Sequence, residues 1–548
     1  MFKKTTKTKL LALSLATTML SPVLAKADFI TAEDPMMVGV NGAQTTALFT
    51  VGETINGYTP TGIMDGIGAY SLNDTTVRVL VSHELGGNRG YAYQLDDGLG
   101  GTVNVTGARI SYFDIDKATK NIVDAGQAYS QIIDRNGSIV ADPAQIGGGL
   151  NRLCSSALFE ANHFDNGRGF DDRVYFTGEE AGNGTQYAVD VESGKAYAMP
   201  AVGYGSWENV TAVDTGVDNK VALVLGDDTG GAPLYMYVGE KSTAADAGFL
   251  ERNGLADGKL YAWKAENGDL DPAAFNGSNG NGLSRDGSWV EVTPYNPAMA
   301  GQPGYDAEGY ALASTLQAEA DSLGAFSFSR PEDVSTNPEN GQELVFASTG
   351  RSSLFDGADK WGTTYKVSLE FDAEGNPIGA LTEILYDGDA DPDNKLRSPD
   401  NLDWADNGKI LLQEDKSYDW ALGGNLAEAS IAYLDPANGW LRQVAEMDRL
   451  ALPDGIIDQD AGILGSWESS GILDVSFLFG TDAGTLFLFD VQAHGIDGQG
   501  VFVNGELVEG GQLLMLDMTS FRVPEPAGLG LLGLGLGGLA LTRRRRKA

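Results

Sequence analysis

Short runs of β-branched and aromatic residues, each flanked by turn-forming residues, are the feature that most constrains the fold of this chain. Such runs occur at 77–81, 173–176, 220–225, 343–347 and 409–413, and Gly, Asp, Asn or Pro lies close to each. Runs of this length and composition are typical of β-strands separated by turns. Helical periodicity is scarce, and only the segments 310–323 and 425–431 would form short helices. The sequence therefore predicts an all-β protein.

The length and the glycine content favour one all-β architecture over the others. Glycine makes up 73 of the 548 residues, and turn signals this frequent favour a sandwich, barrel or propeller over a βαβ arrangement. A propeller blade takes roughly 40 to 50 residues in familiar repeats, so residues 28–520 could hold six or more blades. The sequence Gly-Ser-Trp-Glu occurs at 205–208 and again at 465–468, a hint of repetition. We expect a β-propeller domain over 28–520, with six blades and with loop insertions such as 265–325.

The C-terminal segment, 523–548, has the composition of a sorting signal. Val-Pro-Glu-Pro at 523–526 precedes a run of Ala, Gly and Leu alone at 527–541, and basic residues follow at 543–547. This run is shorter than the roughly 20 residues that a bilayer span needs, and the basic cluster holds its end in the cytoplasm. The order of these parts resembles the PEP-CTERM sorting signals of Gram-negative bacteria, which are recognised in the inner membrane and removed during export. The alternative is a plain C-terminal membrane anchor.

The N-terminal segment, 1–27, also indicates export. It has a basic start, an apolar stretch and an Ala-Lys-Ala sequence at 25–27, which together are typical of a secretory signal peptide. Both termini therefore place the body of the chain in the periplasm, at the cell surface or outside the cell. They imply a transient contact of the tail with the inner membrane, and the sorting signal makes an exopolysaccharide matrix a candidate partner.

The charge of the chain excludes one class of partner. The whole chain has 37 Lys and Arg against 76 Asp and Glu. Without the two terminal signals the counts are 27 and 75, a net charge of −48. Such a chain repels nucleic acid, whose affinity for proteins comes mainly from basic contacts to phosphate. A site for a phosphate group would need metal ions or a few well-placed arginines to reverse the local charge.

Acidic residues lie at or near the ends of several predicted strands, where loops would carry a functional site. These segments are 82–85, 176–180, 225–229, 329–333 and 398–402, and the Trp-Glu pairs that end at Glu208 and Glu468 are candidates to join them. Carboxylates that converge in space suit Ca²⁺, which takes 6 to 8 oxygen ligands. Taken singly, an acidic loop on an acidic protein is more often just solvated.

Taken in order, these segments resemble the PhoX-type alkaline phosphatases, an exported bacterial family, over about 80 to 420. The resemblance rests on Arg-Leu-Cys-Ser at 152–155, Tyr-Phe-Thr-Gly-Glu-Glu at 175–180, Leu-Gly-Asp-Asp-Thr at 225–229, Tyr-Met-Tyr-Val at 235–238, Arg-Pro-Glu-Asp at 330–333 and Pro-Asp-Asn-Leu at 399–402. It implies a propeller whose central end holds an iron and calcium cluster, with a cysteine thiolate on iron, and which hydrolyses phosphate monoesters.

The resemblance also assigns roles to individual residues. It makes Cys154 the iron ligand and Arg330 the residue that holds the phosphate, with Ca²⁺ and Fe³⁺ as the cofactors. The candidate metal ligands are Cys154, Glu180, Glu208, Asp227, Glu332 and Asp400. A guanidinium fork suits this role because it can bind phosphate oxygens in a bidentate manner.

The chain departs from the family pattern at the cysteine. Family members carry the cysteine directly before the Glu-Glu pair, and that position here is Gly178, whereas the only cysteine, Cys154, lies 24 residues earlier. Either Cys154 reaches the same metal from a neighbouring strand, or the iron site is altered or lost. Two structural interpretations also remain open: Cys154 as a small buried hydrophobe, and Arg330 as the partner of Glu332 or Asp333 in a salt bridge.

Two functions from different classes fit the sequence. The first is an exported metal-dependent phosphatase that hydrolyses phosphate monoesters through a calcium and iron cluster. The second is a non-catalytic, calcium-stabilised propeller at the cell surface or in the extracellular matrix, which binds polymer or protein. The three histidines are too few and too scattered for a zinc site built on histidine. No Gly-x-Ser-x-Gly elbow surrounds Ser155 and Ser156, so a serine hydrolase is rejected.

Overall fold

The computed structural model of the chain describes residues 28–522, apart from 278, 391–395 and 416–426. The predicted signal peptide, 1–27, and the predicted sorting segment, 523–548, lie outside these residues. Among the helices of the described part, none is both long enough and apolar enough to cross a membrane. The described residues thus cover the body of the chain between the two predicted signals.

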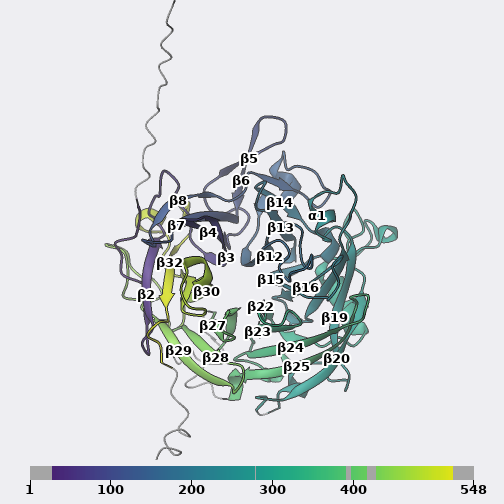
Figure 1. Cartoon of the computed structure of the whole chain (residues 1–548). Coiled ribbons are helices and arrows are strands. Elements are labelled where there is room, and N and C mark those ends of the chain that lie inside the picture. Colours follow the sequence, from purple (N-terminus) through teal and green to yellow (C-terminus); the bar gives the residue numbers. More distant parts are fainter. Residues whose placement is uncertain (1–27, 278, 391–395, 416–426, 523–548) are drawn as a thin grey trace, which may run out of the picture.

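Antiparallel strands make up nearly all of the regular structure, which confirms the all-β prediction (Figure 1). They follow one another in six series that surround a common centre. The first three series are β3 (Met64–Asn73), β4 (Thr76–His83), β7 (Arg109–Asp116) and β8 (Ile122–Gln127); β11 (Leu153–Phe159), β12 (Val174–Gly184), β13 (Gln186–Asp190) and β14 (Lys195–Ala198); and β15 (Gly205–Val213), β16 (Lys220–Asp227), β18 (Tyr235–Glu240), β19 (Gly258–Ala265) and β20 (Ser284–Val292).

The last three series complete the circuit. They are β22 (Pro331–Thr336), β23 (Glu343–Ser348), β24 (Thr363–Phe371) and β25 (Pro377–Asp387); β26 (Pro399–Trp404), β27 (Ile410–Glu414), β28 (Ser430–Asp435) and β29 (Trp440–Met447); and β30 (Glu468–Asp474), β31 (Leu486–Ala493) and β32 (Gly510–Asp517). Because β12 also pairs with β15 and β20 with β25, the second, third and fourth series join, together with β9 (Gln131–Ile133), in one sheet of 14 strands.

The first strand of each series lies at the centre of the molecule. These strands, which we call the inner ring, are β3, β11, β15, β22, β26 and β30. Each contacts the next in chain order, and β30 contacts β3. The inner ring is therefore a closed cycle of packing contacts, although no two inner strands pair with each other in the sheets of the described residues.

The N-terminal strands tie the start of the chain to its end. β1 (Met37–Gly39) pairs with β29, and β2 (Gln44–Thr50) pairs with β32, both antiparallel. Neighbouring series are also joined by buried apolar side chains. Val79 and Phe113 of the first series share a core with Phe487 of the last. Burying a side chain of this size stabilises the fold by about 1.5–3 kcal/mol.

The helical predictions had different outcomes. The helix predicted over 310–323 is confirmed as α3 (Ala313–Ser322). The helix predicted over 425–431 is wrong where the structure describes it, because strand β28 begins at Ser430; residues 425 and 426 lie outside the described part. The predicted insertion, 265–325, contains β20, which pairs with β19 and β25. The first residues of β20, Ser284 to Ser288, are mostly polar, so they do not show the alternation of apolar and polar residues that is expected of a strand.

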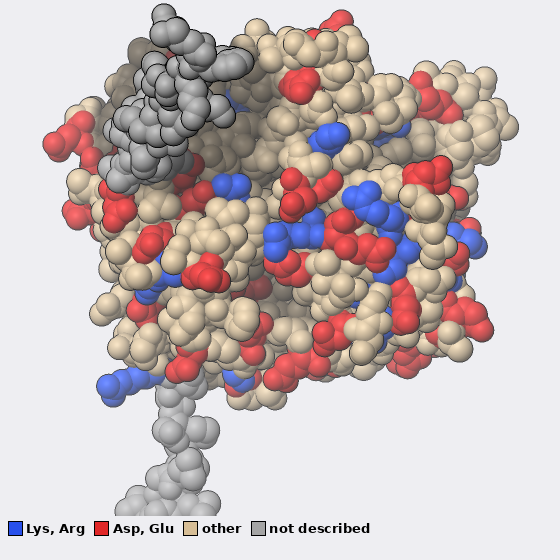
Figure 2. Space-filling view, turned by 45° about the horizontal axis from the view of Figure 1, so that its top comes forward, with Lys and Arg blue, Asp and Glu red and all other residues tan. Residues whose placement is uncertain are grey.

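Acidic side chains are spread widely over the surface. Figure 2 shows Asp and Glu scattered across the visible face, with fewer Lys and Arg set among them. Charge dispersed in this way keeps an acidic protein soluble and does not by itself mark a binding site.

Candidate metal centre and its cavity

Each strand of the inner ring presents an acidic or thiol side chain at the same end of the ring. These residues are Asp65 in β3, Cys154 in β11, Glu208 in β15, Glu332 in β22, Asp400 in β26 and Glu468 in β30. All of them are buried. Because every one lies within the first four residues of its strand, the fold brings together side chains that are far apart in the sequence.

Irregular backbone accompanies these residues. The pairing register of all six inner strands shifts close to them, for example between Leu153 and Ser156 and between Pro331 and Val334. Such bulges re-aim side chains and are frequent beside active sites. The residues directly before four inner strands, Ile63, Arg152, Arg330 and Ser398, also have positive φ, between 44 and 68°. A left-handed conformation costs a non-glycine residue roughly 1–2 kcal/mol, and such strain is concentrated at functional sites.

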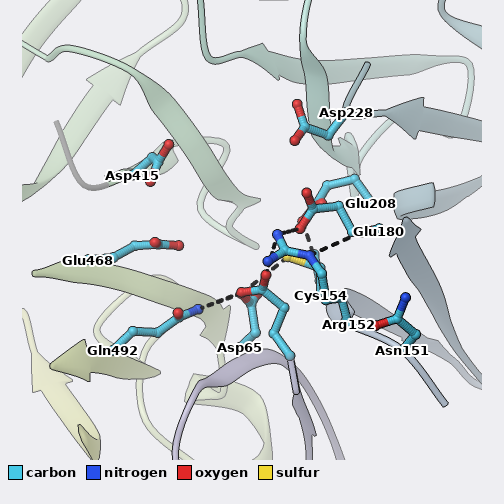
Figure 3. A network of polar contacts seen from close by, with 12 residues as sticks. Asp65, Asn151, Arg152, Cys154, Glu180, Glu208, Asp228, Asp415, Glu468 and Gln492 are labelled. Atoms are coloured by element: carbon cyan, nitrogen blue, oxygen red, sulfur yellow. Dashed lines mark hydrogen bonds and ion pairs between the residues drawn. The ribbon is translucent and has the colours of Figure 1, made fainter. Parts of the chain in front are cut away.

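The ligand atoms form four overlapping groups, and within each group they lie within 4.8 Å of one another. The groups are Asp65, Glu84 and Cys154; Cys154, Glu180 and Glu208; Glu208, Glu332 and Asp400; and Asp400, Asp415 and Glu468. Consecutive groups share Cys154, Glu208 and Asp400 in turn, so they form one continuous row. Figure 3 shows members of this row converging from separate strands and loops, namely Asp65, Cys154, Glu180, Glu208, Asp415 and Glu468.

Cys154 lies among carboxylates. Its Sγ donates to Asp65 Oδ2 at 3.4 Å, and burial, followed by the charges of Asp65 and Glu208, raises the pKa of the thiol well above its usual value. The strand that carries Cys154, β11, pairs with β12, and Leu153 stands opposite Glu179. Cys154 therefore reaches the group that contains Glu180 from the neighbouring strand.

Arginines interleave with the carboxylates. Arg330 makes a bidentate contact with Asp228, with Nε 2.6 Å from Oδ1 and Nη2 3.1 Å from Oδ2. Its Nη2 also lies 2.9 Å from Glu332 Oε1, and its Nη1 lies 3.5 Å from Asp415 Oδ2. On the opposite side, Arg152 pairs with Glu84 and Glu180. The salt bridge from Arg330 to Glu332 that the sequence left open is thus present, and it lies inside the candidate site.

The donor set fits metal cations. Glu208 Oε2 and Asp400 Oδ1 are buried and have no hydrogen-bond partner among the described residues. Burial, followed by the nearby carboxylate of Glu332, raises the pKa of both residues well above the usual value. Carboxylates held this close without donors destabilise one another unless cations lie between them. Carboxylate oxygens suit Ca²⁺ and a thiolate suits iron, so the residues present fit both ions.

A cavity of about 290 Å³, which we call the metal-site cavity, opens onto this row of candidate ligands. It is lined by Ile63, Glu84, Arg152, Cys154, Glu180, Asp228, Arg330, Glu332, Arg351, Asp400, Asp415, Glu468, Gln492 and His494. Five of the residues that the sequence predicted for the site therefore line the cavity. Glu208 does not line it, but it belongs to two of the ligand groups.

The structure does not bring Asp227, the remaining predicted ligand, to the cavity. Asp227 Oδ1 accepts hydrogen bonds from Ser206 N at 3.1 Å and from Thr229 Oγ1 at 2.7 Å. The next residue, Asp228, faces the cavity instead, because successive side chains point to opposite sides of an extended backbone. The sequence pattern Asp-Asp did not distinguish between the two.

Sequence reasoning missed several other residues of the site. Glu84, Asp228 and Glu468 stand in segments that the sequence analysis singled out, without being chosen as ligands. Arg152 belongs to the Arg-Leu-Cys-Ser motif at 152–155, which indicated no separate role for it. Asp65 and Asp415 had no such signal, although Asp415 follows the predicted strand at 409–413 directly after Glu414.

A second cavity, of about 400 Å³, lies at the other end of the inner ring. It is lined by later residues of the same six strands, among them Ile67, Leu158, Thr211, Asp333, Trp404 and Leu473. Asp403, Asp406 and Asp474 add carboxylates, and its lining contains no Lys or Arg. The two cavities thus occupy opposite ends of one set of strands.

Comparisons with known proteins connect the chain to one family. The family model described as Alkaline phosphatase PhoX matches residues 160–449. This stretch includes Glu180, Glu208, Arg330, Glu332 and Asp400, and it begins after Cys154. No curated protein matches the chain.

Solved structures support the fold. The structure of Pseudomonas fluorescens PhoX in complex with vanadate, a transition state analogue, is similar to the chain with a TM-score of 0.58 and 15% sequence identity; the match covers 89% of this chain and 97% of that one. The GH93 α-L-arabinofuranosidase of Fusarium graminearum in complex with arabinobiose has a TM-score of 0.33 and 11% identity, over 83% and 94% of the two chains. Only the first likeness is close enough to bear on the fold.

Proposed function

The chain belongs to the alkaline phosphatase PhoX family, and on that premise we propose that it is an exported, metal-dependent phosphatase that hydrolyses phosphate monoesters. The observation that carries the proposal is the position of Arg330, whose guanidinium lies in the same cavity as the row of candidate metal ligands. A phosphate group and the cations that neutralise its charge would meet there.

The proposed ligands divide by their chemistry. Glu180, Glu208, Glu332 and Asp400 would hold Ca²⁺, and Cys154 would hold iron. Asp228 is the acidic residue of the Asp227 and Asp228 pair that lines the cavity. When bound, the cations would neutralise the phosphate dianion and polarise its oxygens.

The residues of the chain would position the ester and control its charge. Arg330 would take two phosphate oxygens with its fork, as it takes the two oxygens of Asp228. Its side chain is only 16% exposed, so water screens its charge less and its charged contacts are stronger than on an open surface. Asp228, Glu332 and Asp415 surround it and hold the fork in position until the phosphate arrives.

The remaining features of the proposal concern the whole chain. We propose one propeller domain over 28–520, with the inner ring as the central strands of six blades, preceded by a signal peptide at 1–27 and followed by a sorting segment at 523–548. The closed cycle of contacts in the inner ring supports the blade count. The termini support export and retention near an exopolysaccharide matrix.

Hydrolysis and metal content of the purified protein test the proposal together. We expect release of p-nitrophenol from p-nitrophenyl phosphate at alkaline pH, and iron together with calcium in elemental analysis. A protein that binds calcium alone and hydrolyses no ester after loading with both metals would contradict the phosphatase, and it would favour the non-catalytic matrix propeller.

A further inference from the structure

Arg351 is a third arginine of the metal-site cavity, and the proposed function does not use it. It lies in the loop between β23 and β24 and lines the cavity together with Arg152 and Arg330. Backbone hydrogen bonds place this loop beside Arg330: Thr349 N donates to Arg330 O at 3.0 Å, and Gly350 N donates to Ser329 O at 2.8 Å. Arg351 therefore follows directly after a segment that is paired with the backbone of the proposed phosphate-binding residue.

The backbone of Arg351 is held on both sides. Its N–H donates to Asp359 O at 3.1 Å, and its carbonyl accepts from Leu354 N at 3.1 Å. Its Nη1 lies about 3.7 Å from the position that a Cβ on Gly230 would occupy. The guanidinium thus extends across Gly230, which follows Asp228 by two residues, and a fixed loop supports its base.

The charge of Arg351 is not neutralised by an ion pair. Arg152 and Arg330 each contact at least two carboxylates within 4.0 Å, whereas no carboxylate of the described residues lies within that distance of Arg351. Burial would raise the pKa of Asp228, but the charge of Arg330 lowers that pKa below its usual value. The charge of Arg351 adds to this lowering. Both oxygens of Asp228 are already taken by Arg330. Arg351 is also exposed to solvent, so it presents a free guanidinium at the mouth of an otherwise acidic cavity.

We infer that Arg351 is a specificity residue, and that it binds a second anionic group on the alcohol part of the ester. The inference rests on the proposed function. The preferred substrates would be phosphate monoesters whose alcohol carries a carboxylate or a further phosphate, because the phosphate would occupy the Arg330 side of the cavity and the second group would meet Arg351. A fork that is free before binding loses no partner when it takes a carboxylate, and charge-assisted bidentate bonds are among the stronger ones available.

Two pairs of matched compounds test this inference. Phosphoglycolate and ethyl phosphate differ in a carboxylate and a methyl group, and both can be hydrolysed. In 3-phosphonopropionate and propylphosphonate a carbon–phosphorus bond replaces the ester, so their binding is measured by calorimetry on the metal-loaded protein without turnover. We expect the wild-type protein to prefer the carboxylate compound of each pair, in KM and in Kd respectively.

The variant Arg351→Gln should remove that preference. Because the variant loses one charge-assisted contact at an exposed position, KM for phosphoglycolate should rise roughly 5- to 50-fold, while kcat and the values for ethyl phosphate change little. Arg351→Lys should recover part of the preference, because it keeps the charge and loses the fork. Lys259→Gln, which removes one positive charge from an exposed position on β19 paired with Glu291, should behave as wild type.

The results distinguish a wrong role for Arg351 from a wrong proposed function. If wild type hydrolyses ethyl phosphate and Arg351→Gln affects both members of each pair equally, or neither, the role of Arg351 is wrong and the phosphatase stands. If wild type hydrolyses neither ester, the proposed function fails. A carboxylate preference in Kd for the phosphonates, lost in Arg351→Gln, would then still establish the binding role, and its absence would end it.

Discussion

Within β22, Glu332 turns its carboxylate to the metal-site cavity, and the next residue, Asp333, turns its carboxylate to the cavity at the other end of the inner ring. Asp333 accepts hydrogen bonds from Asn209 Nδ2, Val334 N and Leu402 N. At the end that faces the metal-site cavity, Glu208 Oε2 and Asp400 Oδ1 have no such partner among the described residues. Among the inner strands, the carboxylate of Asp333 is thus satisfied by donors, whereas Glu208 and Asp400 each keep an oxygen without one.

This difference explains why only one end is expected to bind metal. A buried carboxylate that accepts several hydrogen bonds has its oxygens satisfied without a cation, whereas burying one that lacks donors is costly unless a cation lies beside it. The metal-site cavity also contains three arginines, and the lining of the second cavity contains none. The carboxylates of the second cavity do not form a group of three ligands among the described residues.

The largest expected effect comes from a ligand shared by two groups. Glu208→Gln keeps the size of the side chain and removes its charge, and it alters the groups that contain Cys154 and Asp400 at once. Because loss of an outer-shell partner of a metal site already costs about 10- to 100-fold, hydrolysis should fall by more than roughly 100-fold. Metal content, measured by elemental analysis, should fall with it.

The matched control for that variant is Asp227→Asn. Asp227 is buried and close in sequence to the cavity-lining Asp228, but its carboxylate is bound by Ser206 N and the Thr229 hydroxyl. Metal content should therefore stay at the wild-type level. Loss of metal in Asp227→Asn, or full retention in Glu208→Gln, would contradict the placement of the ligands at the inner ring.

An intermediate effect is expected at Arg330. Arg330→Lys keeps the positive charge and loses the fork, so kcat/KM for p-nitrophenyl phosphate should fall by roughly one to three orders of magnitude, at about 1.4 kcal/mol for each factor of ten. Arg78→Lys is the control, because Arg78 makes a similar bidentate contact with Asp114 on β4 and β7, outside the cavity. Equal losses in the two variants would indicate a general effect on folding.

Much of the site could be predicted from the sequence because strand ends and acidic residues coincide. Glu180, Glu208, Glu332 and Asp400 were all predicted, and the structure brings them together. The choice of Asp227 over Asp228 could not be decided, because it depends on the direction in which each side chain leaves the backbone. Asp65 was missed for a different reason: it meets Cys154 only through the closure of the ring, between residues that are 89 positions apart.

The fold was predictable at a coarser level. Alternation and turn residues indicated the strands, whereas the helix predicted near 425–431 was overridden by the pairing of β28 with β27 and β29. Propensity in such a short segment is a weak signal that tertiary pairing outweighs. The order of the six series could be expected from a propeller, but the bulges and the strained turns that start the inner strands depend on contacts that no local pattern shows.

The smallest expected effect belongs to the second cavity and concerns stability. Burial, followed by the charges of Asp474, Asp406 and Asp333, raises the pKa of Asp403 well above its usual value. Since the folded state then holds the proton more tightly than the unfolded state, the free energy of unfolding decreases as pH rises above about 3.9, the pKa in unfolded chains. Asp403→Asn keeps the acceptor for Asp474 N and removes this penalty. Its Tm should match wild type near pH 4 and exceed it at pH 8, with hydrolysis unchanged, whereas the exposed Asp218→Asn should follow wild type at both pH values. A loss of hydrolysis in Asp403→Asn would show that the two ends of the inner ring are not independent.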